Sequence, residues 1–194
     1  MPRRRTARVL EPRLGRSRAG SISAETGRKV ILNRQRQFEV RLQPLREFEL
    51  EVRRALRLGR RDFNVCLVDD AAIQEMNQTF RGQARPTDVL SFPWQDGPQS
   101  EVAPSRAVDE MRHFLGDIAI SVQTARRHAR AEGHSLRKEI RWLILHGVLH
   151  LLGYNHAVDE GQMTRRELAL RDKLGLGRNS VRRRAAQRHP RVRA

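Results

Sequence analysis

The chain has few of the residues on which several classes of protein depend. It contains one cysteine, Cys66, so no disulfide can form within the chain, which favours a reducing compartment. It has no run of about 18 apolar residues, and no signal-peptide pattern of a basic start followed by an apolar core. We therefore expect a soluble, cytoplasmic protein.

Negative charge is scarce, and the excess of positive charge is unevenly placed. The formal net charge is +17. Residues 1–24 contribute +6 and residues 178–194 contribute +7, which leaves only +4 for residues 25–177. We expect one folded domain at 25–177 between two basic, disordered tails. Such tails suit a polyanion such as RNA, but arginine outnumbers lysine 36 to 3, and coding composition explains that bias equally well.

Segments of strand-like and helix-like pattern alternate along the domain. This alternation predicts an α+β fold, with a small mixed sheet of about four strands packed against five or so helices. Strands are expected within Lys29–Leu42 and at Phe63–Val68, Thr87–Pro93 and Gly116–Ser121. Helices are expected at Leu45–Leu58, from Asp69 or Asp70 to Phe80, at Val122–Glu132, from Ser135 to Gly153 and at Asp159–Leu174, and residues 95–113 are expected to form a loop.

The stretch Ile140–His156 contains three of the seven histidines. Up to Gly153 it is apolar and free of proline, which predicts a central helix buried on nearly every side. His146 and His150 are four residues apart, so they lie about 40° apart around the axis and about 6 Å apart along it. The two imidazoles can therefore bind one metal ion. With Glu139 they form the main polar sector of the helix, which needs partners if it is buried.

His156 can join the other two histidines only if the chain bends. On a straight helix, six residues would turn it away from His150 by about 240°. Gly153 lies between them, where a helix commonly ends on a left-handed residue, a conformation that glycine adopts freely. Three nitrogen ligands with a fourth position for water are the usual arrangement of a hydrolytic zinc site. Each histidine alone is more typical of a hydrogen-bonded core residue, but the trio His146, His150 and His156 predicts a site for one Zn²⁺ ion.

Four motifs in order extend this pattern along the chain. They are Asn77-Gln78-Thr79-Phe80-Arg81-Gly82, Arg85-Pro86-Thr87-Asp88-Val89-Leu90-Ser91-Phe92-Pro93, Leu115-Gly116-Asp117-Ile118 and the segment from His146 to His156. Over roughly residues 30–175, their order and spacing resemble the bacterial YbeY endoribonuclease family.

The resemblance implies a zinc-dependent endoribonuclease specific for single-stranded RNA. It implies a role in rRNA processing, namely 16S rRNA 3′ end maturation, and in ribosome quality control. The implied partners are rRNA and the small ribosomal subunit, with neither a membrane nor a small-molecule cofactor. By position, His146, His150 and His156 would be the zinc ligands, and His146 and Arg81 the catalytic residues, with Arg81 pairing with a phosphate. Asn155 departs from the family, which usually has Asp there, and an amide would support a neighbouring histidine less strongly.

Two other functions remain open from the residues. The spacing His-x-x-x-His-x-x-Gly-x-x-His also resembles metzincin-type zinc proteases, but these carry a glutamate after the first histidine, where this chain has Gly147. A peptidase would need its general base from elsewhere. The chain is alternatively a ribosome-assembly binding factor whose metal is structural, although a closed site needs a fourth protein ligand.

The remaining polar residues have weaker signals. Asp88 and Asp117 suit either loop capping or support of a metal ligand, and Met163 suits the core. With 5% aromatic residues, we expect RNA recognition through phosphates and shape rather than through stacked bases. The other histidines are expected to be exposed: His113, His128, His134 and His189.

Overall fold

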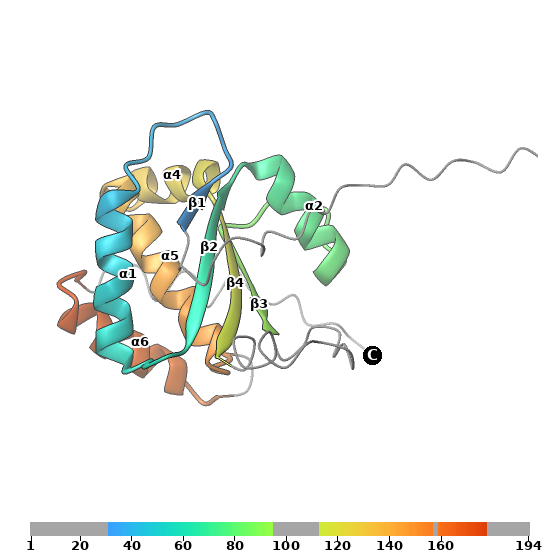
Figure 1. Cartoon of the computed structure of the whole chain (residues 1–194). Helices are drawn as coiled ribbons and strands as arrows, with labels where there is room; N and C mark the ends of the chain where they lie inside the picture. Colours follow the sequence, from blue (N-terminus) through green and yellow to red (C-terminus); the bar gives the residue numbers. More distant parts are fainter. Residues whose placement is uncertain (1–30, 95–112, 157–158, 178–194) are drawn as a thin grey trace, which may run out of the picture.

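The computed structural model describes residues 31–94, 113–156 and 159–177 (Figure 1). Along these residues the elements are β1 (Ile31–Asn33), α1 (Gln43–Leu56), β2 (Asp62–Val68), α2 (Asp70–Arg81), β3 (Val89–Pro93), β4 (Phe114–Ser121), α4 (Val122–Ala131), α5 (Leu136–Leu151) and α6 (Gln162–Lys173). Both expected tails, and all but the last residue of the expected loop at 95–113, lie outside the described residues.

The four strands form one mixed sheet in the order β1-β2-β4-β3. β1, β2 and β4 run parallel, and β3 pairs with β4 in the antiparallel direction as an edge strand. The parallel pairs need helical crossovers, which α1 provides between β1 and β2. The predicted α+β fold with a small mixed sheet is confirmed.

Helices cover both faces of the sheet, as Figure 1 shows. Successive side chains of a strand point to opposite faces, and β4 divides accordingly. Ile118 and Ile120 are fully buried in the larger core, which they share with α1, α5 and α6. Ala119 points to the other face, where it packs with Ile73 of α2 in a smaller core. The site-bearing helix α5 therefore lies against one face of the sheet, and α2 lies against the other.

Side-chain caps begin three of these helices where the sequence places suitable residues. Asp69 accepts a hydrogen bond from the backbone N–H of Ala72 at 2.8 Å, at the start of α2. Ser121 caps α4, and Ser135 caps α5 by accepting from Lys138 N. Each cap provides an acceptor for a backbone donor that the first helical turn leaves unpaired.

The apolar patch Phe38–Leu42 is not a strand, although the patch before it forms β1. The buried side chain of Gln35 explains the difference. Its Oε1 accepts from the backbone N–H groups of Gln37 and Phe38 at 2.9 Å, and its Nε2 donates to Phe38 O at 2.8 Å. These bonds fold the backbone into a local turn instead of a strand.

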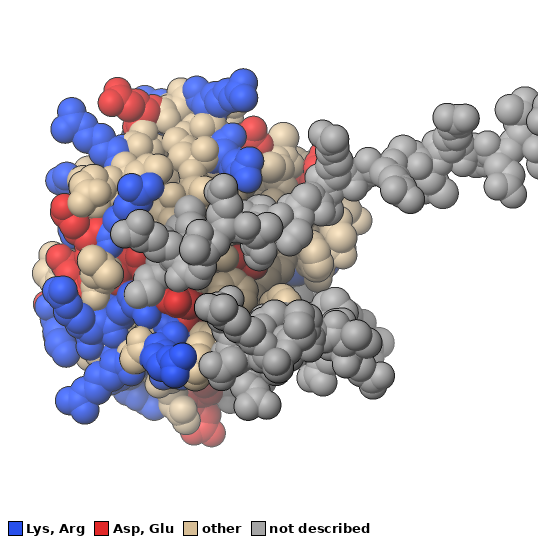
Figure 2. Space-filling view, in the orientation of Figure 1, with Lys and Arg blue, Asp and Glu red and all other residues tan. Residues whose placement is uncertain are grey.

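The face drawn in Figure 2 carries charges of both signs. Lys and Arg side chains are frequent on the left, over α1 and α6, but Asp and Glu side chains lie among them. This mixed surface agrees with the modest charge of +4 for residues 25–177. Among the helices of the described part of the chain, none is long and apolar enough to span a bilayer.

Candidate metal centre

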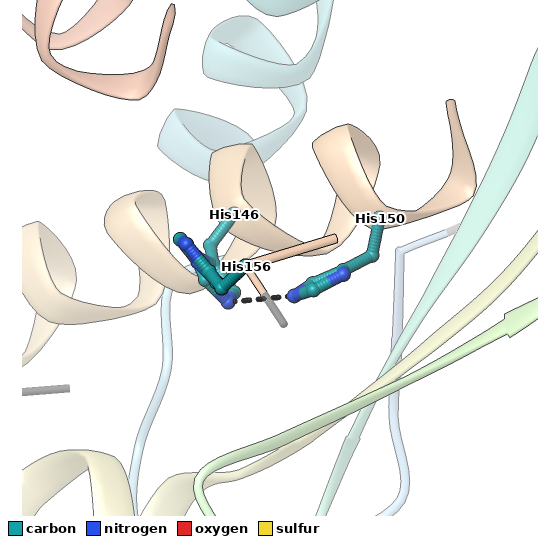
Figure 3. A group of neighbouring side chains, drawn as sticks. All are labelled: His146, His150 and His156. Atoms are coloured by element: carbon teal, nitrogen blue, oxygen red, sulfur yellow. Dashed lines mark hydrogen bonds between the residues drawn. The ribbon is translucent and has the colours of Figure 1, made fainter. Parts of the chain in front are cut away.

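Three histidines converge at the C-terminal end of α5 (Figure 3). His146 and His150 project from the helix, and His156 returns toward them from the segment after it. One ring nitrogen from each lies within 4.8 Å of the others. The Nε2 atoms of His146 and His150 are 3.0 Å apart, and the ring of His156 stacks on that of His146 with centroids 5.2 Å apart. The predicted convergence of the three rings is confirmed.

The bend that returns His156 depends on Gly153. Gly153 has a φ of +89°, in the left-handed region. Its N–H donates to the carbonyl of His150 at 3.0 Å, and the N–H of Tyr154 donates to that of Leu149 at 3.1 Å. These two bonds close the helix in the Schellman pattern, with glycine at the left-handed position. A Cβ on Gly153 would meet no atom within 4 Å, so the glycine is needed for its backbone conformation and not for space.

A buried carboxylate supports the first histidine from behind. Glu167 of α6 is 2% exposed, and its Oε2 lies 3.1 Å from Nδ1 of His146. Its Oε1 accepts from Nη2 of Arg171 at 2.5 Å, and Arg171 is fully buried. Burial opposes ionisation of Glu167, but the hydrogen bond and charge of His146, together with Arg171, lower the carboxyl pKa from 4.5 to about 2.

The sequence reasoning missed Glu167 and Arg171, although the sequence contained a signal for them. The buried face of α6 is made of Met163, Glu167, Leu170 and Arg171, which follow one another at intervals of three or four residues. An acid and a base within an apolar helical stripe are unusual, because buried charges are costly unless paired. Residues of opposite charge four apart on such a stripe therefore predict a buried ion pair.

The position after the first histidine has no room for a side chain. A Cβ on Gly147 would lie 2.8 Å and 2.9 Å from two carbons of Ile118, because α5 presses against β4 at this point. Ser91 of β3 also donates its hydroxyl to the Gly147 carbonyl at 3.3 Å. A glutamate general base cannot occupy this position, which argues against the metallopeptidase hypothesis.

Arg81 lies at the C-terminal end of α2. It is the exposed last residue of α2, which covers the opposite face of the sheet. The preceding Phe80 packs its ring on Phe92 of β3, with centroids 5.0 Å apart. Ser91, the neighbour of Phe92, faces α5 from the other side of the same strand. The end of α2 that carries Arg81 therefore packs against β3, the strand that also contacts α5.

The two aspartates with open roles take part in local contacts. Asp88 is buried, and its Oδ1 accepts from Val89 N at 2.9 Å, so it caps the start of β3. Asp117 is exposed and accepts from Asn64 of the neighbouring strand at 2.9 Å. Both contacts are structural, and neither involves the three histidines.

A second buried carboxylate lies at the N-terminal end of α5. Glu139 has no exposed surface, and its Oε2 lies 3.2 Å from Nε2 of His134. Nδ1 of His128 lies 3.8 Å from its other oxygen. The expectation that His134 is exposed was wrong, because its side chain is only 8% exposed and its ring contacts Trp142 with centroids 4.5 Å apart. The buried glutamate draws this loop histidine inward.

Comparison with known proteins identifies the family to which this chain belongs. The sequence model of the family described as Endoribonuclease YbeY matches residues 28–175. The chain belongs to this family. The YbeY model covers α1 to α6, all three histidines and Glu167, so the site described above lies wholly within the matched region.

Individual YbeY relatives agree with this assignment. The Endoribonuclease YbeY of Moorella thermoacetica is 46% identical over 123 residues, which is 62% of this chain and 77% of that protein. The Desulfitobacterium hafniense protein of the same name is 45% identical over 117 residues, 59% of this chain and 73% of that one. A solution structure of a Thermotoga maritima protein is 25% identical, with a TM-score of 0.49, covering 84% of this chain and 99% of that one.

Proposed function

We propose that this chain is a zinc-dependent endoribonuclease that cuts single-stranded RNA. On this proposal it binds one Zn²⁺ through His146, His150 and His156 and works in the cytoplasm. Its substrate is rRNA at the small ribosomal subunit, where it matures the 16S rRNA 3′ end and takes part in ribosome quality control. Membership of the YbeY endoribonuclease family supports the nuclease activity.

The convergence of three histidine nitrogens within 4.8 Å is the observation that carries the metal proposal. Among the described residues, this group contains no further His, Cys, Asp or Glu ligand. A set of three imidazoles leaves a coordination position for water or substrate, as hydrolytic zinc sites do and closed structural sites do not. The donor set therefore favours catalysis over the binding-factor hypothesis.

The three histidines of the site differ in burial and in their proposed roles. His146 is buried and held by Glu167, so its orientation is fixed before substrate arrives. His150 and His156 are half-buried, which leaves one side of the site open to an RNA strand. A zinc ion held there would polarise a phosphoryl oxygen and lower the pKa of a bound water molecule.

Arg81 is proposed to bind phosphate at the edge of the sheet. Its guanidinium is exposed and able to pair with two phosphate oxygens at once. The Phe80–Phe92 contact fixes the end of α2 against β3, so the backbone of Arg81, the next residue, is held at this edge of the sheet. In this role it would stabilise charge on the phosphate as the bond breaks.

Metal content and cleavage of a labelled oligonucleotide test the proposal together. The full chain should hold about one zinc per molecule and should cut single-stranded RNA faster than the matching duplex. His146→Ala should abolish both zinc binding and cleavage. Arg81→Ala should slow cleavage with zinc content unchanged.

Arg85→Ala is the matched control for Arg81→Ala. Arg85 is also an exposed arginine. In the described part of the chain, its guanidinium donates hydrogen bonds to Oε1 of the nearby Gln83. The control should cut close to the wild-type rate. Full-rate cleavage by His146→Ala would rule out the proposed active site, and equal slowing by both arginine variants would remove Arg81 from it.

A further inference from the structure

Glu167 and Arg171 form a buried ion pair directly behind the histidine site. Glu167 is 2% exposed and Arg171 is fully buried, with its guanidinium carbon 4.6 Å from the centre of the Trp142 ring. Replacing such a pair by apolar residues of similar volume is often neutral or stabilising. Fold stability alone therefore does not account for two charges on the buried face of α6.

The two carboxylate oxygens of Glu167 have different partners. Oε1 accepts from Nη2 of Arg171 at 2.5 Å, which leaves Oε2 directed at Nδ1 of His146 at 3.1 Å. Because Arg171 occupies Oε1 as a donor, Oε2 is the oxygen that can accept a proton carried by His146 Nδ1. In the neutral ring, Nε2 then carries the lone pair. That nitrogen is the one 3.0 Å from Nε2 of His150, on the side where the histidines converge.

We propose that Glu167 and Arg171 are positioning residues that set the tautomer and orientation of His146 before the metal binds. Glu167 acts directly on the ring, and Arg171 acts through Glu167 by holding its carboxylate turned toward Nδ1. This inference rests on the function proposed above, because it requires His146 to be a metal ligand. Hydrogen bonds of this kind to metal-ligating histidines raise metal affinity.

The wild-type chain provides the first test without any substitution. Long-range ¹H–¹⁵N NMR spectra of the full-length, metal-free protein at neutral pH report which ring nitrogen of each histidine carries the proton. The neutral form of the His146 ring should carry its proton at Nδ1. A neutral ring protonated at Nε2 would overturn the proposal.

Zinc affinity of three variants forms the second test, measured by competition with a chromophoric chelator. Glu167→Gln has nearly the same shape and should bind zinc about 10- to 100-fold more weakly. Arg171→Met should also weaken binding, by a smaller factor. In the double variant the Arg171 substitution should add nothing further, because its effect passes through the carboxylate. Independent, multiplying losses would show that Arg171 does not act through Glu167.

Glu139→Gln is the matched control. Glu139 is also a buried carboxylate paired with a histidine, His134, but it lies at the N-terminal end of α5. It should leave zinc affinity unchanged, so a loss equal to that of Glu167→Gln would overturn the proposal. If Arg171→Met does not fold, Arg171→Lys keeps the charge and should retain most of the affinity. Wild-type protein that binds no zinc would refute the proposed function itself, whereas normal zinc binding by Glu167→Gln would refute only the positioning role.

Discussion

The two ends of α5 use the same pair of residue types in different ways. At the N-terminal end, buried Glu139 lies 3.2 Å from His134. At the C-terminal end, buried Glu167 lies 3.1 Å from His146. Both pairs satisfy a charge that would otherwise be costly inside the protein. Within the described residues, only the C-terminal pair has further histidines gathered within ligand distance, so only that end forms a candidate metal site.

The difference between the ends shows what a metal site needs beyond a buried histidine. At the N-terminal end the carboxylate is central, and His128 and His134 approach it from outside the helix. At the C-terminal end the carboxylate lies behind one ring, and the Nε2 atoms of His146 and His150 lie 3.0 Å apart on the far side of that ring. A carboxylate behind a histidine directs the lone pair of that ring forward, and of the two ends only the C-terminal one is arranged in this way.

The largest contrast is expected between His156→Ala and His134→Ala. Removing His156 deletes one of the three proposed zinc ligands, so zinc affinity should fall by more than the roughly 10- to 100-fold typical of an outer partner, and RNA cleavage should fall with it. His134→Ala removes the histidine that lies 3.2 Å from buried Glu139, so it should lower the free energy of unfolding while zinc-dependent cleavage persists. Zinc titration, a cleavage assay and urea unfolding check the pair. Equal loss of cleavage in both variants would show that the two ends of α5 do not differ in function.

Much of the fold, and the convergence of the three histidines, could be predicted from local sequence. The helix of Leu136–Leu151, its cap at Ser135 and the bend at Gly153 all depend on residues close in the chain. Glu167 could not be placed, because it meets His146 only through the packing of α6 on α5. His134 was misjudged for a different reason, because its partner Glu139 is only five residues away but the charged, loop-like context does not reveal that this glutamate is buried. Arg81 stays a prediction, resting on its motif.

Low pH should destabilise the fold at the C-terminal end of α5 by protonating Glu167. The folded-state pKa of this carboxyl is lowered from 4.5 to about 2, so its contribution to stability is fully present above about 4.5 and is lost as pH falls toward 2. The whole contribution is on the order of 3 kcal/mol. Urea unfolding of metal-free protein between pH 5 and 2.5 should therefore show a steeper decline for wild type than for Glu167→Gln. Parallel declines would mean that the pair does not stabilise the ionised carboxylate.

Gly147→Ala should lower the free energy of unfolding by crowding the contact between α5 and β4. The added methyl group would lie 2.8 Å from a carbon of Ile118, so α5 and β4 must move apart, at a cost of about 1–3 kcal/mol. Chemical denaturation measures this cost. Ile118→Val in the same chain removes one of the crowded groups and should restore part of the lost stability. No recovery would show that the contact with Ile118 is not the source of the strain.

The smallest effect is expected from two glycines that flank α5. Gly133 and Gly153 both have positive φ values, +69° and +89°, and a Cβ on either would meet no atom within 4 Å. Alanine at either position should therefore cost only the left-handed conformation, about 1–2 kcal/mol. The two substitutions should lower the free energy of unfolding alike, but only Gly153→Ala should also weaken zinc binding, because this bend returns His156. If both variants bind zinc as tightly as wild type does, His156 reaches the site without help from the glycine.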